Sequence, residues 1–284
     1  MNILYGKDIV DSISVEINTM LEKLQKINKI PKLIILRVGK REDDITYEHS
    51  IKKKLDSFGL PYITKEYDED VSVDTMKQEI LKYNEDHTIS SIMIFRPLPK
   101  HLTNAEITEL IDPKKDIDCA TLYNQGRLFD REDCLYYPCT PKAVMETLRY
   151  NKIDLKSKKV VIAGASQVVG KPLTMMFLKE KATVTTCNSD TVDLNLITKN
   201  ADIVVAAIGK AKYLTKEYFS KNQIVIDVGI NFDENGKMCG DVDFENLDME
   251  NITITPVPRG IGSITTTILV KQLVEKEYKT SNII

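Results

Sequence analysis

A glycine-rich turn is the first stretch whose composition could support chemistry. It reads GASQVVG, with Gly164, Ala165 and Ser166 at its start and Gly170 at its end. The apolar run KKVVIA precedes it and a helical pattern follows. In that context small residues let backbone N–H groups and a helix N-terminus approach a pyrophosphate. The spacing is not G-x-G-x-x-G, so a tight strand-to-helix turn without a ligand stays an alternative. A nucleophile elbow is excluded, because Val168 stands where that motif requires glycine.

The end of the next apolar run, TVTTCNS (183–189), bears on which dinucleotide such a turn could bind. An acidic residue there hydrogen-bonds the ribose 2′-hydroxyl of NAD, whereas a basic residue accommodates the 2′-phosphate of NADP. Ser189 and Asp190 occupy this place, and neither it nor Ala165 offers an arginine or lysine. The sequence therefore favours NAD. In the alternative, Asp190 is a helix N-cap whose side chain turns away from the ligand.

The stretch YEHSIKKKLDSFG (47–59) combines a tyrosine with three consecutive lysines on one predicted helix. Residues four apart on a helix share a face, so Ile51 lies on the face of Tyr47, and Lys52 points about 100° around the helix from Ile51. We interpret the lysines as a solvated helix edge, with Lys53 the one expected to face the ligand.

Metal and disulfide chemistry are not indicated. The three histidines lie at no metal-ligand spacing with another His or Cys. The five cysteines form no C-x-x-C pair, and their odd number argues against a disulfide framework. We predict no metal site and reduced, partly buried thiols.

The elements that must position these residues alternate along the chain. Helical periodicity covers 7–28, 44–57, 73–85, 170–182, 192–201 and 263–278, and strand-like runs cover 31–39, 62–67, 90–97, 158–166, 183–189, 202–209 and 223–231. Such alternation predicts βαβ units and parallel sheets. We expect an α/β fold of two domains, an N-terminal substrate domain and a Rossmann-like, doubly wound cofactor domain, with a ligand cleft between them. The pattern breaks between about 119 and 140, where we place the boundary.

Composition excludes several partner classes. The chain has 284 residues, 42% of them hydrophobic, which can supply a core. The chain has 39 Lys and Arg residues and 42 Asp and Glu residues, which gives a net charge of -3. Its overall charge therefore does not attract nucleic acid or an anionic membrane. No apolar run approaches the roughly 20 residues of a membrane span, and the N-terminus lacks a secretory-signal pattern. We expect a cytoplasmic protein that acts on a small molecule.

Motifs that are weak singly and specific together span nearly the whole chain. In order they are YEHSIKKKLDSFG (47–59), RPLPKHL (96–102), PKKDID (113–118), NQGRL (124–128), PCTP (138–141), GASQVVGKP (164–172), TVTTCNS (183–189), DVGIN (227–231), GDVDF (240–244) and TPVPRGIGS (255–263). Their order and spacing resemble the bifunctional methylenetetrahydrofolate dehydrogenase/cyclohydrolase family.

The resemblance implies a function in one-carbon metabolism and purine biosynthesis. NAD(P)+ would oxidise 5,10-methylenetetrahydrofolate to 5,10-methenyltetrahydrofolate, which is then hydrolysed to 10-formyltetrahydrofolate. It implies a folate-binding catalytic domain over 1–120, completed by the C-terminal helix at about 263–284, and an NAD(P)-binding domain over 140–262. It also implies a homodimer paired through the cofactor domain. NADP is the family default, whereas Ala165 and Asp190, which replace basic family residues, favour NAD.

The family's site residues carry over to matching positions of this chain. Tyr47 would stack on the folate, Asp118 would bind the pterin ring, and Lys53 matches a peripheral basic position, so these three are the candidate catalytic residues. The expected substrate-binding residues are Tyr47, Ile51, Phe95, Pro97, Asp118, Pro258 and Gly262. The expected cofactor-binding residues are Gly164, Ala165, Ser166, Gly170, Ser189, Asp190, Gly229 and Ile230.

Two touching polar positions of the family are apolar here, namely its lysine (Ile51) and the glutamine before Pro-Leu-Pro (Phe95). Replacing both together avoids leaving one partner unsatisfied, which would cost about 1–3 kcal/mol. Hydride transfer needs chiefly proximity and orientation of the nicotinamide. Hydrolysis of the methenyl product needs proton transfers, which contribute about 10²- to 10⁴-fold. We therefore predict a dehydrogenase whose cyclohydrolase step is weak or lost.

Further departures keep alternatives open. Cys119 and Ala120 replace the glycine and aromatic residue that usually follow Asp118, and Arg259 and Ser263 stand where the family has glycine and proline. One alternative is a non-catalytic folate- or nucleotide-binding descendant. Another is a dehydrogenase of a different small substrate. If Lys52 or Lys53 reached in from a shifted helix, hydrolysis could survive.

Overall fold

The computed structural model describes residues 1–130 and 134–281, and the chain divides into two compact units. Unit 1 comprises Met1–Asp11 with Cys139–Thr265, and unit 2 comprises Ser12–Pro138 with the residues from Thr266 onward. The sequence-based division placed the first residues with the folate-binding part. In the structure β1 (Asn2–Ile3) instead pairs in parallel with β11 (Thr253–Ile254) of unit 1. The last three residues of the predicted C-terminal helix, 282–284, lie outside the described residues.

Unit 2 is built on a three-stranded parallel sheet in the order β3-β2-β4. Its strands are β2 (Leu33–Val38), β3 (Tyr62–Tyr67) and β4 (Ser91–Ile94). Its helices are α2 (Glu42–Ser57), α3 (Val73–Glu85), α4 (Lys100–Asn104), η1 (Ile107–Leu110) and α5 (Leu122–Phe129), with most of α1 (Lys7–Gln25) and α9 (Ile261–Thr280). Helices α2 and α3 connect successive parallel strands, which confirms the predicted βαβ units.

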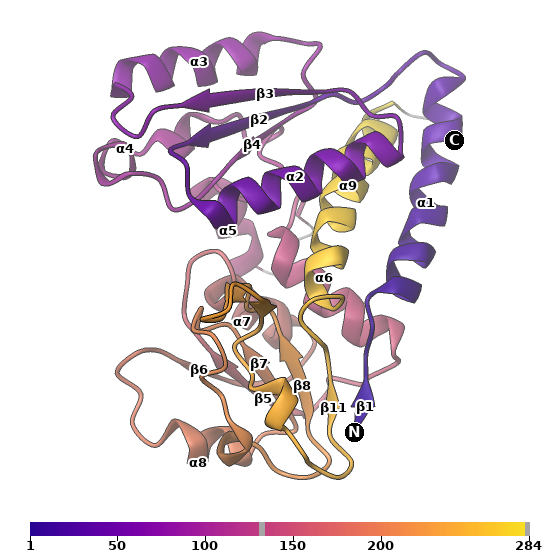
Figure 1. Ribbon diagram of the computed structural model, residues 1–284. Helices are drawn as coiled ribbons and strands as arrows, with labels where there is room; N and C mark the ends of the chain where they lie inside the picture. Colours follow the sequence, from indigo (N-terminus) through magenta and orange to yellow (C-terminus); the bar gives the residue numbers. More distant parts are fainter. Residues whose placement is uncertain (131–133, 282–284) are drawn as a thin grey trace. The chain divides into compact units, whose positions relative to one another are not determined.

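The two faces of this sheet pack against different helices (Figure 1). Ile34 and Leu36 of β2 join Ile80 of α3 in one hydrophobic cluster. Arg37, the next residue along β2, reaches Glu48 of α2 on the opposite face. Since successive side chains of a strand alternate between faces, the register of β2 places α2 and α3 on opposite sides of the sheet.

Unit 1 carries a six-stranded, all-parallel sheet in the order β1-β11-β8-β7-β5-β6. Its other strands are β5 (Lys159–Ala163), β6 (Thr183–Cys187), β7 (Ile203–Ala206) and β8 (Ile224–Asp227). Its helices are α6 (Cys139–Tyr150), α7 (Gly170–Lys179), α8 (Leu194–Lys199), η2 (Lys216–Tyr218) and η3 (Phe244–Asn246). The chain passes from β5 to β6 and then returns across β5 to β7. This reversal is the switch point of a doubly wound fold and confirms the Rossmann-like prediction.

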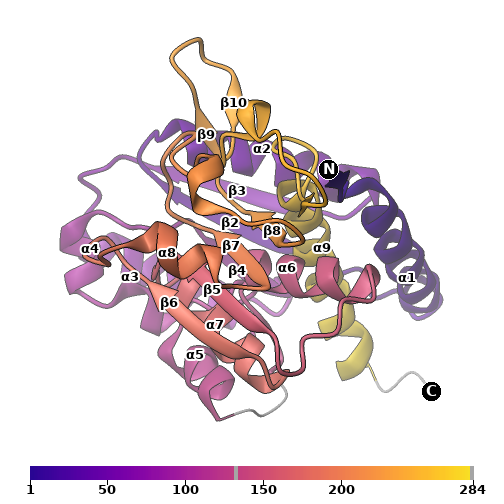
Figure 2. The same cartoon turned by 90° about the horizontal axis from the view of Figure 1, so that it is seen from below.

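Several predicted strands end earlier in the structure, and short elements were missed. The predicted strand 223–231 is wrong beyond Asp227, where a loop leads into the hairpin of β9 (Asn231–Phe232) and β10 (Met238–Cys239). Figure 2 shows this hairpin extending beyond the six-stranded sheet. Strands of two residues, such as β1 and β9, are too short to produce a periodic pattern. In the described part of the chain, no helix is long and apolar enough to cross a membrane.

Candidate functional site

In unit 2, Tyr47 of α2 and Phe95, which follows β4, form an edge-to-face aromatic pair. Their ring centroids lie 5.9 Å apart at an interplanar angle of 88°. Ile51, one helical turn after Tyr47, is fully buried, and Phe95 is 4% exposed. An ammonium group in the place of Ile51 would be desolvated, which disfavours its charged form. We call the Tyr47 and Phe95 rings, together with Ile51 on the helix face of Tyr47, the apolar patch.

The neighbouring lysines are not part of this patch. Lys52 forms an ion pair with Glu48, which also accepts a hydrogen bond of 2.6 Å from Nε of Arg37. Burial alone would raise the pKa of the Glu48 carboxyl, but its bonds to Lys52 and Arg37 outweigh burial and lower that pKa. Lys53 is exposed and lies about 200° around α2 from Ile51. The helix therefore anchors Lys52 through Glu48 and turns Lys53 to the solvent.

Asp118 is held by an arginine that the sequence analysis did not single out. Nη2 of Arg96 lies 3.1 Å from Oδ2 of Asp118 and 3.2 Å from its main-chain oxygen. The two side chains are 13% and 14% exposed. An anchored carboxylate of this kind can accept hydrogen bonds from the N–H groups of a heterocycle. The only signal in the sequence that could have identified Arg96 was its place directly before Pro97. Pro97, a predicted substrate-binding residue, is exposed.

The loop that carries Asp118 is organised by a second, buried aspartate. Asp116 accepts hydrogen bonds from the N–H groups of Ala120 (2.7 Å) and Thr121 (2.9 Å), from the Thr121 hydroxyl (2.8 Å) and from Nδ2 of Asn124 (2.8 Å). A buried carboxylate is tolerated only when donors satisfy it, so these bonds fix the path of the loop. Asp116 therefore positions the segment on which Asp118 lies.

In unit 1, the glycine-rich turn is packed so closely that its glycines cannot carry side chains. Gly164 has φ +127°, and a Cβ built on it would overlap the carbonyl oxygen of Ala207, which follows β7. A Cβ on Gly170 would overlap the carbonyl oxygen of Gly164. Ser166 is exposed at the turn, and its hydroxyl accepts from the N–H of Val169 at 3.1 Å. Close strand-to-helix packing with small, exposed residues is the arrangement that lets a pyrophosphate approach.

Ser189 and Asp190 are exposed just after β6, where a ribose-recognising residue belongs. The Asp190 N–H donates to Oδ1 of Asn188 at 3.0 Å, so the two residues lie on a tight turn. The N-cap of α8 is Asp193. The alternative in which Asp190 caps this helix is therefore wrong.

The remaining candidates lie in or after loops of unit 1. Gly229 is buried and Ile230 is 46% exposed, both between β8 and β9. Pro258 and Gly262 are exposed, and a Cβ on Gly262 would lie 3.7 Å from Cδ1 of Ile230. Pro258 and Gly262, predicted to bind the folate, thus belong to unit 1, whereas the other predicted substrate-binding residues belong to unit 2.

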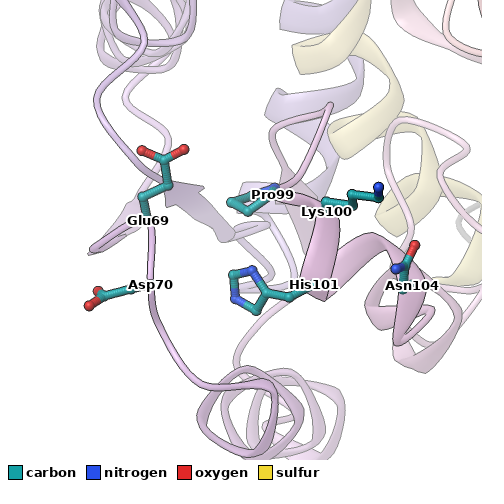
Figure 3. A pocket seen from close by; sticks show the side chains of 6 residues that line it. All are labelled: Glu69, Asp70, Pro99, Lys100, His101 and Asn104. Carbon is teal, nitrogen blue, oxygen red and sulfur yellow. The ribbon is translucent and has the colours of Figure 1, made fainter.

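An open hollow in unit 2, of about 710 Å³, is lined by residues from two segments (Figure 3). Glu69 and Asp70 follow β3, and Pro99, Lys100, His101 and Asn104 come from α4 and the residue before it. Nε2 of His101 lies 2.9 Å from the carbonyl oxygen of Val71, which ties the two segments together. The described lining contains no predicted site residue. Nowhere in the residues that the structure describes do three or more His, Cys, Asp or Glu side chains gather to hold a metal ion.

The doubly wound sheet and close-packed glycine-rich turn of unit 1, together with a second α/β unit, define the class of two-unit α/β proteins with a dinucleotide-binding fold. Within this class, the chain belongs to the tetrahydrofolate dehydrogenase/cyclohydrolase family. The model of the family's NAD(P)-binding domain matches residues 138–281, and that of its catalytic domain matches residues 4–118.

Individual relatives are similar over nearly the whole chain. The bifunctional protein FolD of Clostridium botulinum is 48% identical over 279 residues, which cover 98% of this chain and 99% of that protein. The crystal structure of the bifunctional enzyme FolD from Campylobacter jejuni matches with a TM-score of 0.92 at 34% identity, over 99% of both chains. The methylenetetrahydrofolate dehydrogenase-cyclohydrolase of Trypanosoma brucei, solved with NADP and an inhibitor, matches with a TM-score of 0.90 at 30% identity, over 98% of this chain and 97% of that chain.

The packing of the glycine-rich turn predicts opposite effects of two glycine-to-alanine changes. Gly170→Ala should lower the free energy of unfolding by about 1–3 kcal/mol or more, because the new methyl group meets backbone that cannot move aside. Gly126→Ala, in the open interior of α5, should raise it by about 0.5–1 kcal/mol, since nothing lies within 4 Å of the added Cβ. Urea denaturation of both variants measures the difference. Equal shifts would show that the turn can relax around a side chain.

Proposed function

We propose that this protein oxidises 5,10-methylenetetrahydrofolate to 5,10-methenyltetrahydrofolate with NAD(P)+. The observation that carries the proposal is the Asp118–Arg96 pair in the same unit as the Tyr47–Phe95 pair, in a chain of this family. When bound, NAD(P)+ supplies the hydride acceptor, and the lone pair of a folate nitrogen drives the hydride from the methylene carbon.

The residues of unit 2 bind and orient the folate in this proposal. The Asp118 carboxylate, held by Arg96, accepts hydrogen bonds from the pterin N–H groups, and the Tyr47 ring stacks on the folate. Phe95 supports the Tyr47 ring from its edge. Hydride transfer needs orientation and no proton transfer, so an apolar patch suits it.

We further propose that the cyclohydrolase step is weak or lost. Attack of water on the methenyl carbon and opening of the ring require proton transfers. The positions that would hold the family's amine and amide are filled by Ile51 and Phe95, both buried. Lys52 cannot reach in without giving up its ion pair with the buried Glu48, and Lys53 is exposed.

Separate assays of the two half-reactions on the purified protein test this proposal. We expect NAD(P)H formation from 5,10-methylenetetrahydrofolate and a rate of methenyl hydrolysis no higher than the spontaneous one. Ile51→Lys combined with Phe95→Gln should raise hydrolysis by about 10²-fold, within the usual range for a positioned acid–base group. Ile51→Lys alone should do less, because its ammonium would be buried without the amide partner that the family has at the position of Phe95.

Ser50→Lys is the matched control, since it adds a lysine at an exposed position next to Ile51. It should leave hydrolysis at the spontaneous rate. Robust hydrolysis by the unmodified protein would refute the proposed loss. Absence of any NAD(P) reduction would favour a non-catalytic descendant or a different small substrate.

We propose NAD as the preferred cofactor, supported by the exposed Asp190 after β6 and by the absence of a basic side chain at Ala165. Asp190→Asn should lower the ratio of kcat/KM for NAD to that for NADP by about three- to tenfold, because it removes charge repulsion of the 2′-phosphate. Asp193→Asn removes the same charge from an exposed residue three positions later and should leave the ratio unchanged. A strong preference of the unmodified protein for NADP would contradict the proposal.

The family resemblance also supports a homodimer, paired through the cofactor domain, and a cytoplasmic location. Light scattering at several protein concentrations measures the first of these, and a monomeric mass throughout would count against it.

A further inference from the structure

Two buried aspartates of unit 1 have no part in the proposed chemistry. Asp227 ends β8 and Asp241 follows β10, and their exposed fractions are 2% and 0%. A carboxylate at this depth must be satisfied by hydrogen-bond donors. The donors are main-chain N–H groups and one side-chain amide. Their positions in the chain show which loops the two carboxylates hold in place.

The Asp241 carboxylate holds two loops together. Its Oδ2 accepts from the N–H groups of Ile208 (2.6 Å) and Gly209 (3.1 Å), and its Oδ1 accepts from the N–H of Lys210 (3.0 Å) and from Nδ2 of Asn231 (2.9 Å). The first three donors follow β7 directly, and the fourth, Asn231, begins β9 at the end of the loop that follows β8. One side chain therefore ties the loop after β7 to the end of the loop after β8.

The Asp227 carboxylate fixes Asp241 in turn. It accepts from the N–H groups of Gly229 (2.9 Å), Asp241 (3.1 Å) and Val242 (2.9 Å). A Cβ on Gly229 would overlap the Asp241 carboxylate, and a Cβ on Gly240 would overlap that of Asp227. The glycines of DVGIN and GDVDF thus leave room for the two carboxylates. Burial raises the pKa of Asp227 to about 7, and the charge of Asp241 adds to this effect while the N–H bonds oppose it.

These loops lie where the second half of a dinucleotide belongs. In a doubly wound sheet one mononucleotide half binds over the first two strands and the other binds across the switch point. Here β5 and β6, with the Gly164 turn and Asp190, would receive the adenosine half. The nicotinamide half would then extend over the carboxyl ends of β7 and β8, at the loops that Asp241 holds.

We propose that Asp241 is a positioning residue for the nicotinamide half of the cofactor, an inference that rests on the proposed NAD(P)-dependent function. The loops after β7 and β8 leave the sheet ladder, so their main-chain groups need other partners to keep one conformation. The Asp241 carboxylate supplies main-chain partners in the loop after β7 and also binds the side chain of Asn231. In the loop after β8 the N–H of Gly229 is bound by Asp227, whose carboxylate also holds the N–H of Asp241. These bonds are in place before any ligand binds. The loops then lose little conformational entropy when the cofactor binds, and this raises the affinity for the nicotinamide half that they contact.

Titration of the full-length Asp241→Asn variant with two probes tests the proposal. NAD+ reports on the whole site, and ADP reports on the adenosine half alone. Asparagine keeps the shape of the side chain but turns an N–H₂ group toward the N–H donors of one loop. We expect the Kd for NAD+ to rise about tenfold and the Kd for ADP to stay within about twofold. A purely structural role would weaken both probes alike.

Two further variants keep the test decisive. Asn231→Ala removes a single donor to Asp241 and should raise the Kd for NAD+ by about threefold. This variant keeps the test possible even if Asp241→Asn fails to fold. Asp243→Asn, whose carboxylate accepts from the side chain of Asn246, should change neither constant. Unchanged NAD+ binding in Asn231→Ala, or equal losses for NAD+ and ADP, would overturn the proposal. An unmodified protein that binds neither probe would refute the proposed function, and this inference with it.

Discussion

The capture of main-chain N–H groups by buried carboxylates is the interaction on which both candidate sites depend. The three buried aspartates lie where regular strand pairing stops. Asp227 ends the parallel strand β8, Asp241 follows β10 of the antiparallel hairpin, and Asp116 pairs with Ile92 of β4 only through an isolated bridge. Hydrogen bonds to a charged group contribute about 1.5–3 kcal/mol each, whereas a buried carboxylate without donors is strongly destabilising. Each aspartate therefore stabilises the observed conformation of its loop, because a conformation without these donors would leave a buried carboxyl group unsatisfied.

Much of the fold could be predicted because period and length are local properties. The alternation of apolar runs and helical patterns predicted β2, β3, β5, β6, α2, α3 and α7 within a few residues of their observed bounds. It failed where tertiary contacts decide. The apolar run of β8 continues beyond Asp227, but the carboxylates of Asp227 and Asp241 take the N–H groups that would have continued the ladder. The N-terminal strand was missed because two residues carry no period, and its pairing with β11 joins residues about 250 positions apart.

The site shows the same division between local and distant signals. Ile51 and Phe95 could be identified by counting from Tyr47 and from Pro97, and the structure buries both side chains and brings Phe95 to Tyr47. Arg96 was missed, because its partner Asp118 is 22 residues away and nothing local pairs the two. Asp116 and Asp241 lay within motifs quoted for the resemblance. Their roles were invisible there, because a sequence does not show how many N–H groups converge on one carboxylate.

The apolar replacement at Ile51 and Phe95 has a consequence for how the proposed reaction ends. The methenyl product is a cation whose carbon is attacked by water, so an enzyme that hydrolyses it must admit water and move protons beside that carbon. A buried isoleucine and phenylalanine beside Tyr47 do neither, and Lys52 is committed to Glu48. In the proposed function the product would then leave as the methenyl compound. A separate hydrolytic reaction would have to convert it to the formyl compound. The oxidation itself could run in either direction, according to the supply of the two folate compounds and of the oxidised and reduced cofactor.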